Sequence, residues 1–502
     1  MKKLALLLCT SLFLWTACES DLGSDPTTSS PEGTSSVFGS DDNTFGNNGG
    51  GDPTGSGQPN EIIENPFVET TEESISTFSI DADGASYSNS RRLLVAGHLP
   101  HPDVIRTEEL VNYFNYDYPN PTGSHPIGLE GEISTCPWAE SHKLVRIGIK
   151  GREIVRQQYP ASNLVFLVDV SGSMNGKDEL GLLKEGFKLM VDQLRWEDRI
   201  SLVTYASNPR VVLPSVSGSD KETIRKAIDD LSAGGSTNGE GGILTAYDIA
   251  EANFIEGGNN RIILATDGDF NVGVSSQEEL VELIEVQREK DIFLTVLGVG
   301  RGHYQEGKME QLANNGNGNF EYLDNIDQCR KVFIDEYNKF FAVAKDVKVQ
   351  VEFNPEVVKA YRLIGYENRL LTTEEFEDDT KDAGEIGAGQ CITALYEIIP
   401  ASDPNTASSA FTIDFRYKFP TADTSIPISM DIYDEETTFE SASDDHRFAA
   451  AVAAFGLQLR DSEYKGEITY QKISNWAEDS RSYDPYGYKA QFSTMIDMAR
   501  NL

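Results

Sequence analysis

The chain has 502 residues, too many for one hydrophobic core of ordinary size, so we expect more than one domain. Its 81 acidic residues outnumber its 42 Lys and Arg residues, which gives a formal net charge of −39. A nucleic-acid partner is therefore not expected, because neutralising phosphates requires a basic surface.

Residues 1–17 have the pattern of a secretory signal peptide. A short basic start precedes an apolar stretch at 4–15, and small residues lie just before Cys18. The apolar stretch is shorter than the roughly 20 residues that a membrane-spanning helix needs. The segment Leu14–Cys18 resembles a bacterial lipobox, which implies a lipid on Cys18. We expect a lipoprotein of the bacterial cell envelope, anchored in the outer membrane or at the cell surface. A plain secretory signal or an uncleaved anchor is the alternative.

Residues 18–65 are expected to form a disordered acidic tether. The segment is rich in Ser, Gly, Asn, Asp, Thr and Pro and has almost no aliphatic side chains up to about residue 60. Such a composition cannot bury enough apolar surface to offset the entropy lost on ordering.

Three cysteines remain beyond the expected lipid anchor, and they are Cys136, Cys329 and Cys391. Their spacing matches no zinc motif, and three thiols do not make a disulfide framework. Their redox state is left open by the sequence.

The rest of the chain divides by hydrophobic periodicity into five segments. Strand–helix alternation over 162–342 predicts an α/β domain with a doubly wound, mainly parallel sheet and helices on both faces. The apolar period changes to two over 343–440, which is typical of antiparallel strands. We expect the strands of 128–161 to join this β-rich domain, so that the α/β domain is an insertion. Helical regions are expected over 66–127 and 441–502.

Oxygen-bearing side chains follow the apolar strand Val165–Val168. Asp169, Ser171 and Ser173 are spaced two apart, and a helix is expected after them. In open α/β sheets, ligands bind beyond the carboxyl ends of the strands. Hydroxyls and a carboxylate suit a hard divalent cation such as Mg²⁺, with Mn²⁺ or Ca²⁺ as alternatives.

Two further loops are expected at the same edge of the sheet. Gly234–Gly239 is a glycine-rich loop that carries Thr237, and Asp267 follows the apolar strand Ile262–Ala265. In a doubly wound sheet all three loops lie at the same edge, so these side chains can converge with Asp169.

The three elements in this order resemble the metal-ion-dependent adhesion site of von Willebrand factor type A (VWA) domains. The resemblance implies that Ser171, Ser173 and Thr237 bind the metal directly. It also implies that Asp169 and Asp267 act mostly through water or orient the ligands.

Other segments, among them Glu108–Phe114, Thr266–Gly273 and Phe448–Gly456, resemble the bacterial YfbK-type lipoproteins. The resemblance covers about residues 70–500, and it implies a fold and a metal site but no reaction.

The resulting hypothesis is a cell-envelope lipoprotein whose VWA domain binds proteins in a metal-dependent way, for adhesion or complex assembly. An Asp or Glu carboxylate of the protein ligand would complete the coordination of the metal. We do not expect an enzyme, because aspartyl-phosphate chemistry needs an acid two residues after Asp169, where Ser171 stands. The alternatives are a metal-assisted hydrolase or phosphatase, and a structural envelope protein whose metal only stabilises the fold.

Overall fold

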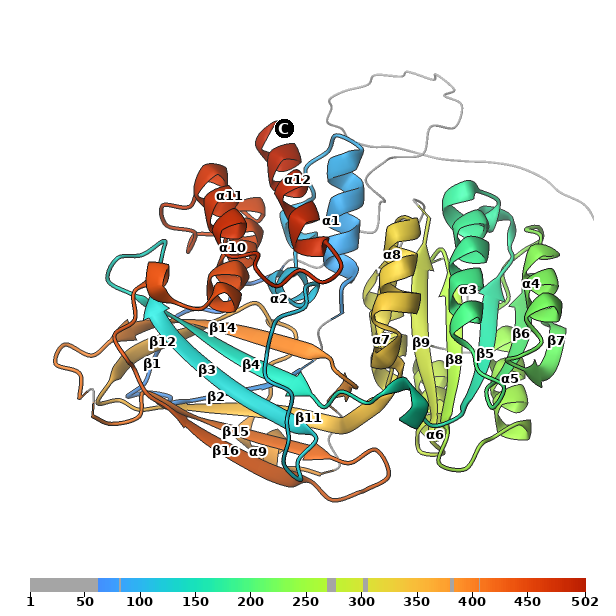
Figure 1. Ribbon diagram of the computed structural model, residues 1–502, viewed down its shortest axis with the longest axis horizontal. Helices are drawn as coiled ribbons and strands as arrows, with labels where there is room; N and C mark the ends of the chain where they lie inside the picture. The colour runs from blue at the N-terminus through green and yellow to red at the C-terminus, as the bar shows by residue number, and fades with distance from the viewer. Residues whose placement is uncertain (1–61, 81–82, 269–276, 301–305, 380–382, 406) are drawn as a thin grey trace, which may run out of the picture. The chain divides into compact units, whose positions relative to one another are not determined.

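The computed structural model describes residues 62–80, 83–268, 277–300, 306–379, 383–405 and 407–502 (Figure 1). The expected signal peptide at 1–17, Cys18 and most of the expected tether lie outside these residues.

The last part of the expected tether, residues 62–65, belongs to the folded part of the chain. The side-chain amide of Asn65 donates hydrogen bonds to the carbonyls of Leu363 and Gly365, at 3.1 and 2.8 Å. The folded part of the chain therefore includes the last residues of the expected tether, because the Asn65 side chain bonds to a distant part of the sequence.

A six-stranded sheet has the strand order β10-β9-β8-β5-β6-β7. All neighbouring strands are parallel except β6 and β7, which are antiparallel. The α/β class with a mainly parallel sheet is confirmed. The strands are β5 (Ser162–Asp169), β6 (Arg199–Tyr205), β7 (Arg210–Ser217), β8 (Asn259–Thr266), β9 (Ile292–Val299) and β10 (Phe320–Leu323).

Strand β7 was missing from the sequence prediction. It lies at the edge of the sheet, is largely exposed and contains Pro214, which edge strands tolerate because one side needs no hydrogen bonds. Its apolar residues therefore do not form the buried run that marks the inner strands.

Helices cover both faces of this sheet because successive side chains of a buried strand point to opposite sides. Leu164, Phe166 and Val168 of β5 belong to the same core as α3, whereas Val165 and Leu167 belong to the core that contains α5. The helices on the first face are α3 (Leu182–Gln193), α4 (Lys221–Asp229) and α8 (Ile326–Arg330). Those on the second are α5 (Gly239–Ala252), α6 (Gln277–Arg288) and α7 (Glu306–Asn315).

Two antiparallel sheets make up the β-rich part of the chain. One has the order β1-β12-β14-β4-β3, and the other has the order β13-β11-β15-β16, with β2 also paired to β11. Strands β3 and β4 precede the six-stranded sheet in the sequence, and β12 and β14 follow it. The strands are β1 (Val68–Glu69), β2 (Ile75–Ser79), β3 (Ile127–Thr135), β4 (Lys143–Gly151), β11 (Ala342–Phe353), β12 (Val358–Ile364), β13 (Gly384–Gly387), β14 (Cys391–Pro400), β15 (Phe411–Lys418) and β16 (Ile426–Ile432).

The expected helical region at 66–127 contains strands β1 and β2 in addition to helices. Strand β2 pairs with β11, where Phe78 lies opposite Val349. The pairing joins residues far apart in the sequence, and a five-residue strand offers little periodicity of its own.

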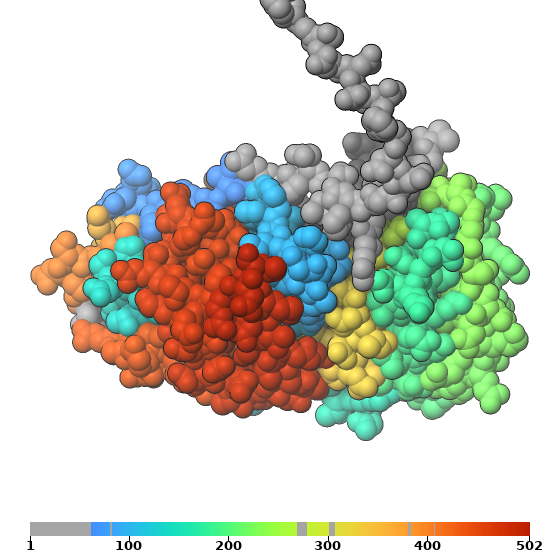
Figure 2. Space-filling model, turned by 90° about the horizontal axis from the view of Figure 1, so that it is seen from above, coloured from blue at the N-terminus to red at the C-terminus, as the bar shows by residue number. Residues whose placement is uncertain are grey.

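The helices at the two ends of the chain pack on one another. In Figures 1 and 2 the N-terminal helices, in blue, lie against the C-terminal helices, in red, and α2 contacts α10 while α1 contacts α12. These helices are α1 (Ala85–Val95), α2 (Thr107–Asn112), α10 (Asp444–Leu459), α11 (Tyr470–Asp479) and α12 (Tyr488–Arg500); a short α9 (Thr373–Glu377) lies apart from them. In the part of the chain that the structure describes, no helix is both long and apolar enough to cross a bilayer.

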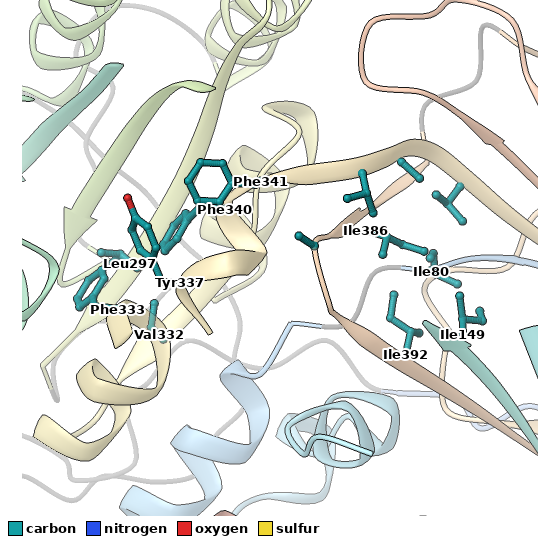
Figure 3. Packing of buried hydrophobic residues seen from close by; sticks show 14 of the residues in the cluster. Ile80, Ile149, Leu297, Val332, Phe333, Tyr337, Phe340, Phe341, Ile386 and Ile392 are labelled. Atoms are coloured by element: carbon teal, nitrogen blue, oxygen red, sulfur yellow. The ribbon is translucent and has the colours of Figure 1, made fainter. Parts of the chain in front are cut away.

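One hydrophobic core continues from the six-stranded sheet into the antiparallel sheets. Figure 3 shows Phe333, Phe340 and Phe341 at the end of the α/β part, and Ile149 and Ile386 among the antiparallel strands. All five are buried members of the same cluster. The two parts therefore share packing, which favours their folding together.

Candidate metal centre

The candidate centre lies where the strand order of the six-stranded sheet reverses. After β5 the chain forms β6 and β7 on one side, and then β8, β9 and β10 on the other. The carboxyl ends of β5 and β8 therefore flank the switch point at which α/β sheets bind ligands. Asp169 is the last residue of β5, and Asp267 directly follows β8. The register, which pairs Val168 with Ala265, brings the two strand ends level.

Asp169 organises the first loop of the centre. Its side chain is fully buried, and Oδ1 accepts a hydrogen bond from the backbone N–H of Ser171 at 2.8 Å. Oδ2 lies 3.4 Å from the hydroxyl of Thr266, which donates to it. The hydroxyl oxygens of Ser171 and Ser173 are 3.0 Å apart. Ser171 is buried and Ser173 is exposed, so the cluster is closed at its base and open to solvent at one side.

Asp169 is a buried carboxylate that lies near a second acid, Asp267. Burial raises its pKa to about 6, and the charge of Asp267 acts in the same direction, whereas hydrogen bonds from Ser171 and Tyr205 oppose it. The polar groups named here are neutral or acidic, and none of them is a cation. The fold therefore holds a desolvated carboxylate beside a second acid, an arrangement that a bound cation would stabilise.

Backbone hydrogen bonds join the glycine-rich loop to the first loop. The N–H of Gly234 donates to the carbonyl of Val170 at 2.7 Å, and the N–H of Gly172 donates to the carbonyl of Gly235 at 3.0 Å. Gly235 has φ 101°, and a Cβ there would lie 2.9 Å from the hydroxyl of Ser207. Glycine is thus required for this approach. Thr237, which is half-buried, follows two residues later.

The structure brings the sequence-predicted residues together to different degrees. Asp169, Ser171 and Ser173 lie in one hydrogen-bonded loop, and Asp267, 6% exposed, lies at the end of the adjacent strand. For Thr237, the connection to this loop runs through the backbone of its own loop.

Two side chains in this network were missed by the sequence reasoning, Thr266 and Tyr205. Thr266 donates to Asp169 and accepts a hydrogen bond from the N–H of Gly268 at 3.2 Å, so it orders both strand ends. Tyr205 ends β6 and is buried beneath Asp169. Both residues end their strands at the expected sheet edge, but only the register of neighbouring strands brings them to Asp169.

The helix expected after this loop does not follow it directly. Regular helix α3 begins at Leu182, and a π-helical turn at Lys177–Gly181 precedes it. Glu179 in this turn has non-helical backbone angles.

The donor set consists only of carboxylate and hydroxyl oxygens. Within the described ranges, no group of three His, Cys, Asp or Glu side chains is arranged to hold a metal ion. A cation at the switch point would therefore depend on serine and threonine hydroxyls in addition to the two aspartates.

The three cysteines beyond the expected anchor are free and buried. Burial raises the pKa of each thiol, at Cys136, Cys329 and Cys391. Thiols of this kind are poor nucleophiles and poor metal ligands.

Three family models match consecutive parts of the chain. A model described as the von Willebrand factor type A domain matches residues 163–334, and one described as the C-terminal part of the uncharacterized protein YfbK matches 338–502. A third, described as von Willebrand factor, matches 55–146. The match at 163–334 covers the six-stranded sheet except Ser162, and it includes Asp169, Thr237 and Asp267 of the candidate centre.

One curated relative matches most of the chain, and others match parts of it. The uncharacterized protein YfbK of Escherichia coli is 41% identical over 470 residues, which are 89% of this chain and 81% of that protein. The uncharacterized protein sll0103 of Synechocystis is 24% identical over 240 residues, 47% of this chain and 56% of that protein. A solved von Willebrand factor type A protein from Catenulispora acidiphila aligns with a TM-score of 0.42 and 15% identity, over 75% of this chain and 90% of that one. The chain therefore belongs to the YfbK family and contains a von Willebrand factor type A domain.

Proposed function

We propose that this chain displays a divalent-metal-dependent VWA domain that binds other proteins at the bacterial cell envelope. The observation that carries the proposal is the convergence of oxygen donors at the switch point. Asp169 and Asp267 lie at the ends of adjacent strands, and the hydroxyls of Ser171 and Ser173 lie 3.0 Å apart above them.

These residues fit a hard divalent cation, Mg²⁺ first and Mn²⁺ or Ca²⁺ as alternatives. By the resemblance to adhesion-type sites, Ser171, Ser173 and Thr237 would hold the ion directly, and Asp169 and Asp267 would act through water. When bound, the ion would offer uncompensated positive charge to a partner's Asp or Glu carboxylate. The inner end of the site is buried and preorganised, because Asp169 is fully buried and its hydrogen bond fixes the backbone of Ser171.

The proposed role is binding rather than catalysis. The residue two positions after Asp169 is Ser171, a hydroxyl that cannot serve as the general acid of phosphoryl transfer at neutral pH. The hydroxyl of Ser171 also lies next to that of Ser173, as expected of a pair of metal ligands.

The proposed location rests on the sequence before the described residues. A lipid on Cys18 would hold the folded part, which begins by Ile62, outside the membrane on the intervening acidic segment. Exchange of Cys18 for Ser should release the protein from the membrane fraction of cells, and a Cys9→Ser exchange is the matched control. Retention of the Cys18 variant in the membrane would contradict the lipid anchor.

Calorimetry tests metal binding directly. The purified protein is titrated with MgCl₂ after removal of bound metal by chelator, and we expect one site that is lost in Asp169→Ala. Asp230→Ala, which removes an exposed acid just after α4, is the matched control. A binding isotherm unchanged in Asp169→Ala would contradict the assigned site.

A pull-down from envelope extract then tests the partner. Proteins captured by the wild type with Mg²⁺ should be lost in chelator and with Asp169→Ala. Capture that persists in chelator and with Asp169→Ala would contradict metal-dependent binding. Hydrolysis of a phosphoester by the wild type that is lost in Asp169→Ala would support the hydrolase alternative. A metal that raises the melting temperature without affecting protein capture would favour the structural alternative.

A further inference from the structure

A groove of about 500 Å³ lies in the antiparallel part of the molecule, and it shares no residue with the candidate metal centre. Residues of β1, β12 and β2 and the segment Leu370–Glu374 line the groove. Val68, Ile75, Tyr361 and Leu363 make up the apolar part of this lining, the apolar floor of the groove. The volume lies in the range of about 300–1,000 Å³ that is typical of ligand pockets.

The sequence Thr-Thr-Glu-Glu occurs on both sides of this groove. The copy at Thr70–Glu73 follows β1, and the copy at Thr372–Glu375 begins α9. Each copy brings an exposed glutamate to the groove lining, Glu73 on one side and Glu374 on the other.

Each copy is held in place by its own threonine. The hydroxyl of Thr70 donates to the carbonyl of Val358 at 2.7 Å and so fixes the first copy to β12. Thr372 and Glu375 cap α9 reciprocally, at 3.2 and 2.9 Å between side chain and backbone. The two glutamates are therefore presented by ordered turns, so less conformational entropy is lost when they bind a ligand.

The charge of the groove has one sign. Glu73 and Glu374 are its charged residues, and the described lining contains no Lys, Arg or His. Glu73 lies close enough to Tyr361 to add to the effect of burial, which raises the pKa of that phenol. Leu370, 50% exposed, adds an apolar side chain at the mouth. An apolar floor between two acidic sides is complementary to an apolar group flanked by cations.

We propose that this groove binds a basic segment of a partner protein, with one apolar side chain on the floor and Lys or Arg residues at Glu73 and Glu374. Strand addition at β2 is not the mode of binding. One side of β2 pairs with β11, and on the other side the N–H of Leu371 already donates to the carbonyl of Thr77 at 2.9 Å. Recognition thus depends on side chains.

Fluorescence polarisation with short labelled peptides tests the proposal on the full chain. The probe is Lys-Lys-Leu-Lys-Lys, compared with Lys-Lys-Ser-Lys-Lys and Glu-Glu-Leu-Glu-Glu. We expect the leucine peptide with lysines to bind most tightly and the acidic peptide not to bind. All titrations are repeated in chelator, where the metal centre is inactive and peptide binding should be unchanged.

Two double variants with the same change in net charge locate the binding. Glu73→Gln/Glu374→Gln should weaken binding about three- to tenfold, the effect of losing two exposed ion pairs. Glu72→Gln/Glu140→Gln removes two exposed acids outside the groove lining and should leave the affinity unchanged. Leu370→Ser, at an exposed position, should reduce the preference for the leucine peptide.

Several results would overturn the proposal. These are absence of measurable binding by the leucine peptide, equal weakening in both double variants, and equal affinity for the leucine and serine peptides. Loss of binding in chelator would indicate that the peptide binds at the metal centre, and would also overturn the proposal that it binds in the groove. Because the proposed metal-dependent function is tested with Asp169→Ala, failure of one proposal does not decide the other.

Discussion

Two buried carboxylates, Glu397 in the antiparallel part and Asp169 at the end of the six-stranded sheet, have opposite surroundings. In the antiparallel part, the carboxylate of Glu397, 3% exposed, accepts hydrogen bonds from Arg362 at 2.9 Å and from Trp138 at 3.2 Å. At the end of the six-stranded sheet, the buried Asp169 instead lies near a second acid, Asp267. Paired buried charge holds the fold together, whereas buried charge of one sign prepares a site for an external cation.

The sharpest test of this comparison is to remove the acid of the buried pair. Glu397→Ala leaves the guanidinium of Arg362 buried without its carboxylate, and we expect the free energy of unfolding to fall by about 3–5 kcal/mol. Urea unfolding followed by circular dichroism measures the change. Asp230→Ala removes the partner of Lys226 in an exposed ion pair, and the resulting change in stability should be too small to measure. Equal losses in the two variants would break the comparison.

The opposite result is expected at the candidate metal centre. Asp169→Asn removes a charge that burial and Asp267 both disfavour, so in chelator it should raise the free energy of unfolding at pH 7 by about 3 kcal/mol. The stabilisation of the wild type that we expect from Mg²⁺ should be absent in the same variant. Thermal unfolding with chelator and with Mg²⁺ measures both effects. A variant that is less stable in chelator would show that the charge is already compensated within the fold.

A third test concerns His446, a buried group beside a cation in the antiparallel part. Burial and the charge of Arg146 lower its pKa to about 3, while Glu132 acts in the opposite direction. Because the folded pKa lies below the unfolded value of about 6.5, its contribution to stability is complete above pH 6.5 and is lost as the pH falls toward 3.

Between pH 7.5 and 5.5 the wild type should therefore lose about 1.4 kcal/mol through this residue. His446→Gln should show a flatter dependence of unfolding free energy on pH over this interval, although it is less stable at pH 7. Urea unfolding at both pH values is the measurement. Parallel pH profiles for the two proteins would mean that His446 titrates normally in the folded state.

The smallest effect is expected at the loop that carries Thr237. Gly235→Ala places a side chain at φ 101° and close to Ser207, which should cost about 1 kcal/mol of stability and weaken Mg²⁺ binding. Gly123→Ala, where nothing lies within 4 Å of the new Cβ, is the control. Normal Mg²⁺ affinity in Gly235→Ala would separate this loop from the metal centre.

Much of the α/β part could be predicted from local pattern. The apolar run Val165–Val168 is buried on both faces of its strand, and Asp169, Ser171 and Ser173 follow it directly. Strand–helix alternation then brings the end of β8, with Asp267, to the same edge, because right-handed crossovers leave few other arrangements. Fold class and the positions of these residues thus follow from short stretches of sequence.

Other features could not be predicted, because they depend on contacts between distant residues. Tyr205 and Thr266 are ordinary strand residues in the sequence, and only the register of neighbouring strands places them on Asp169. Residues Ile75–Ser79 form strand β2 through pairing with β11, which lies far away in the sequence. Glu108 of the short helix α2 is buried against Gly365, which the acidic local sequence does not indicate.

The α/β class, the family resemblance and the oxygen-rich ends of β5 and β8 follow from the amino-acid sequence, because hydrophobic period and strand-end chemistry are local properties. Which charges are paired and which lie together depends on tertiary contacts. These contacts also bring Glu73 and the segment Thr372–Glu374 to one groove, because strand pairing across hundreds of residues depends on what each face buries.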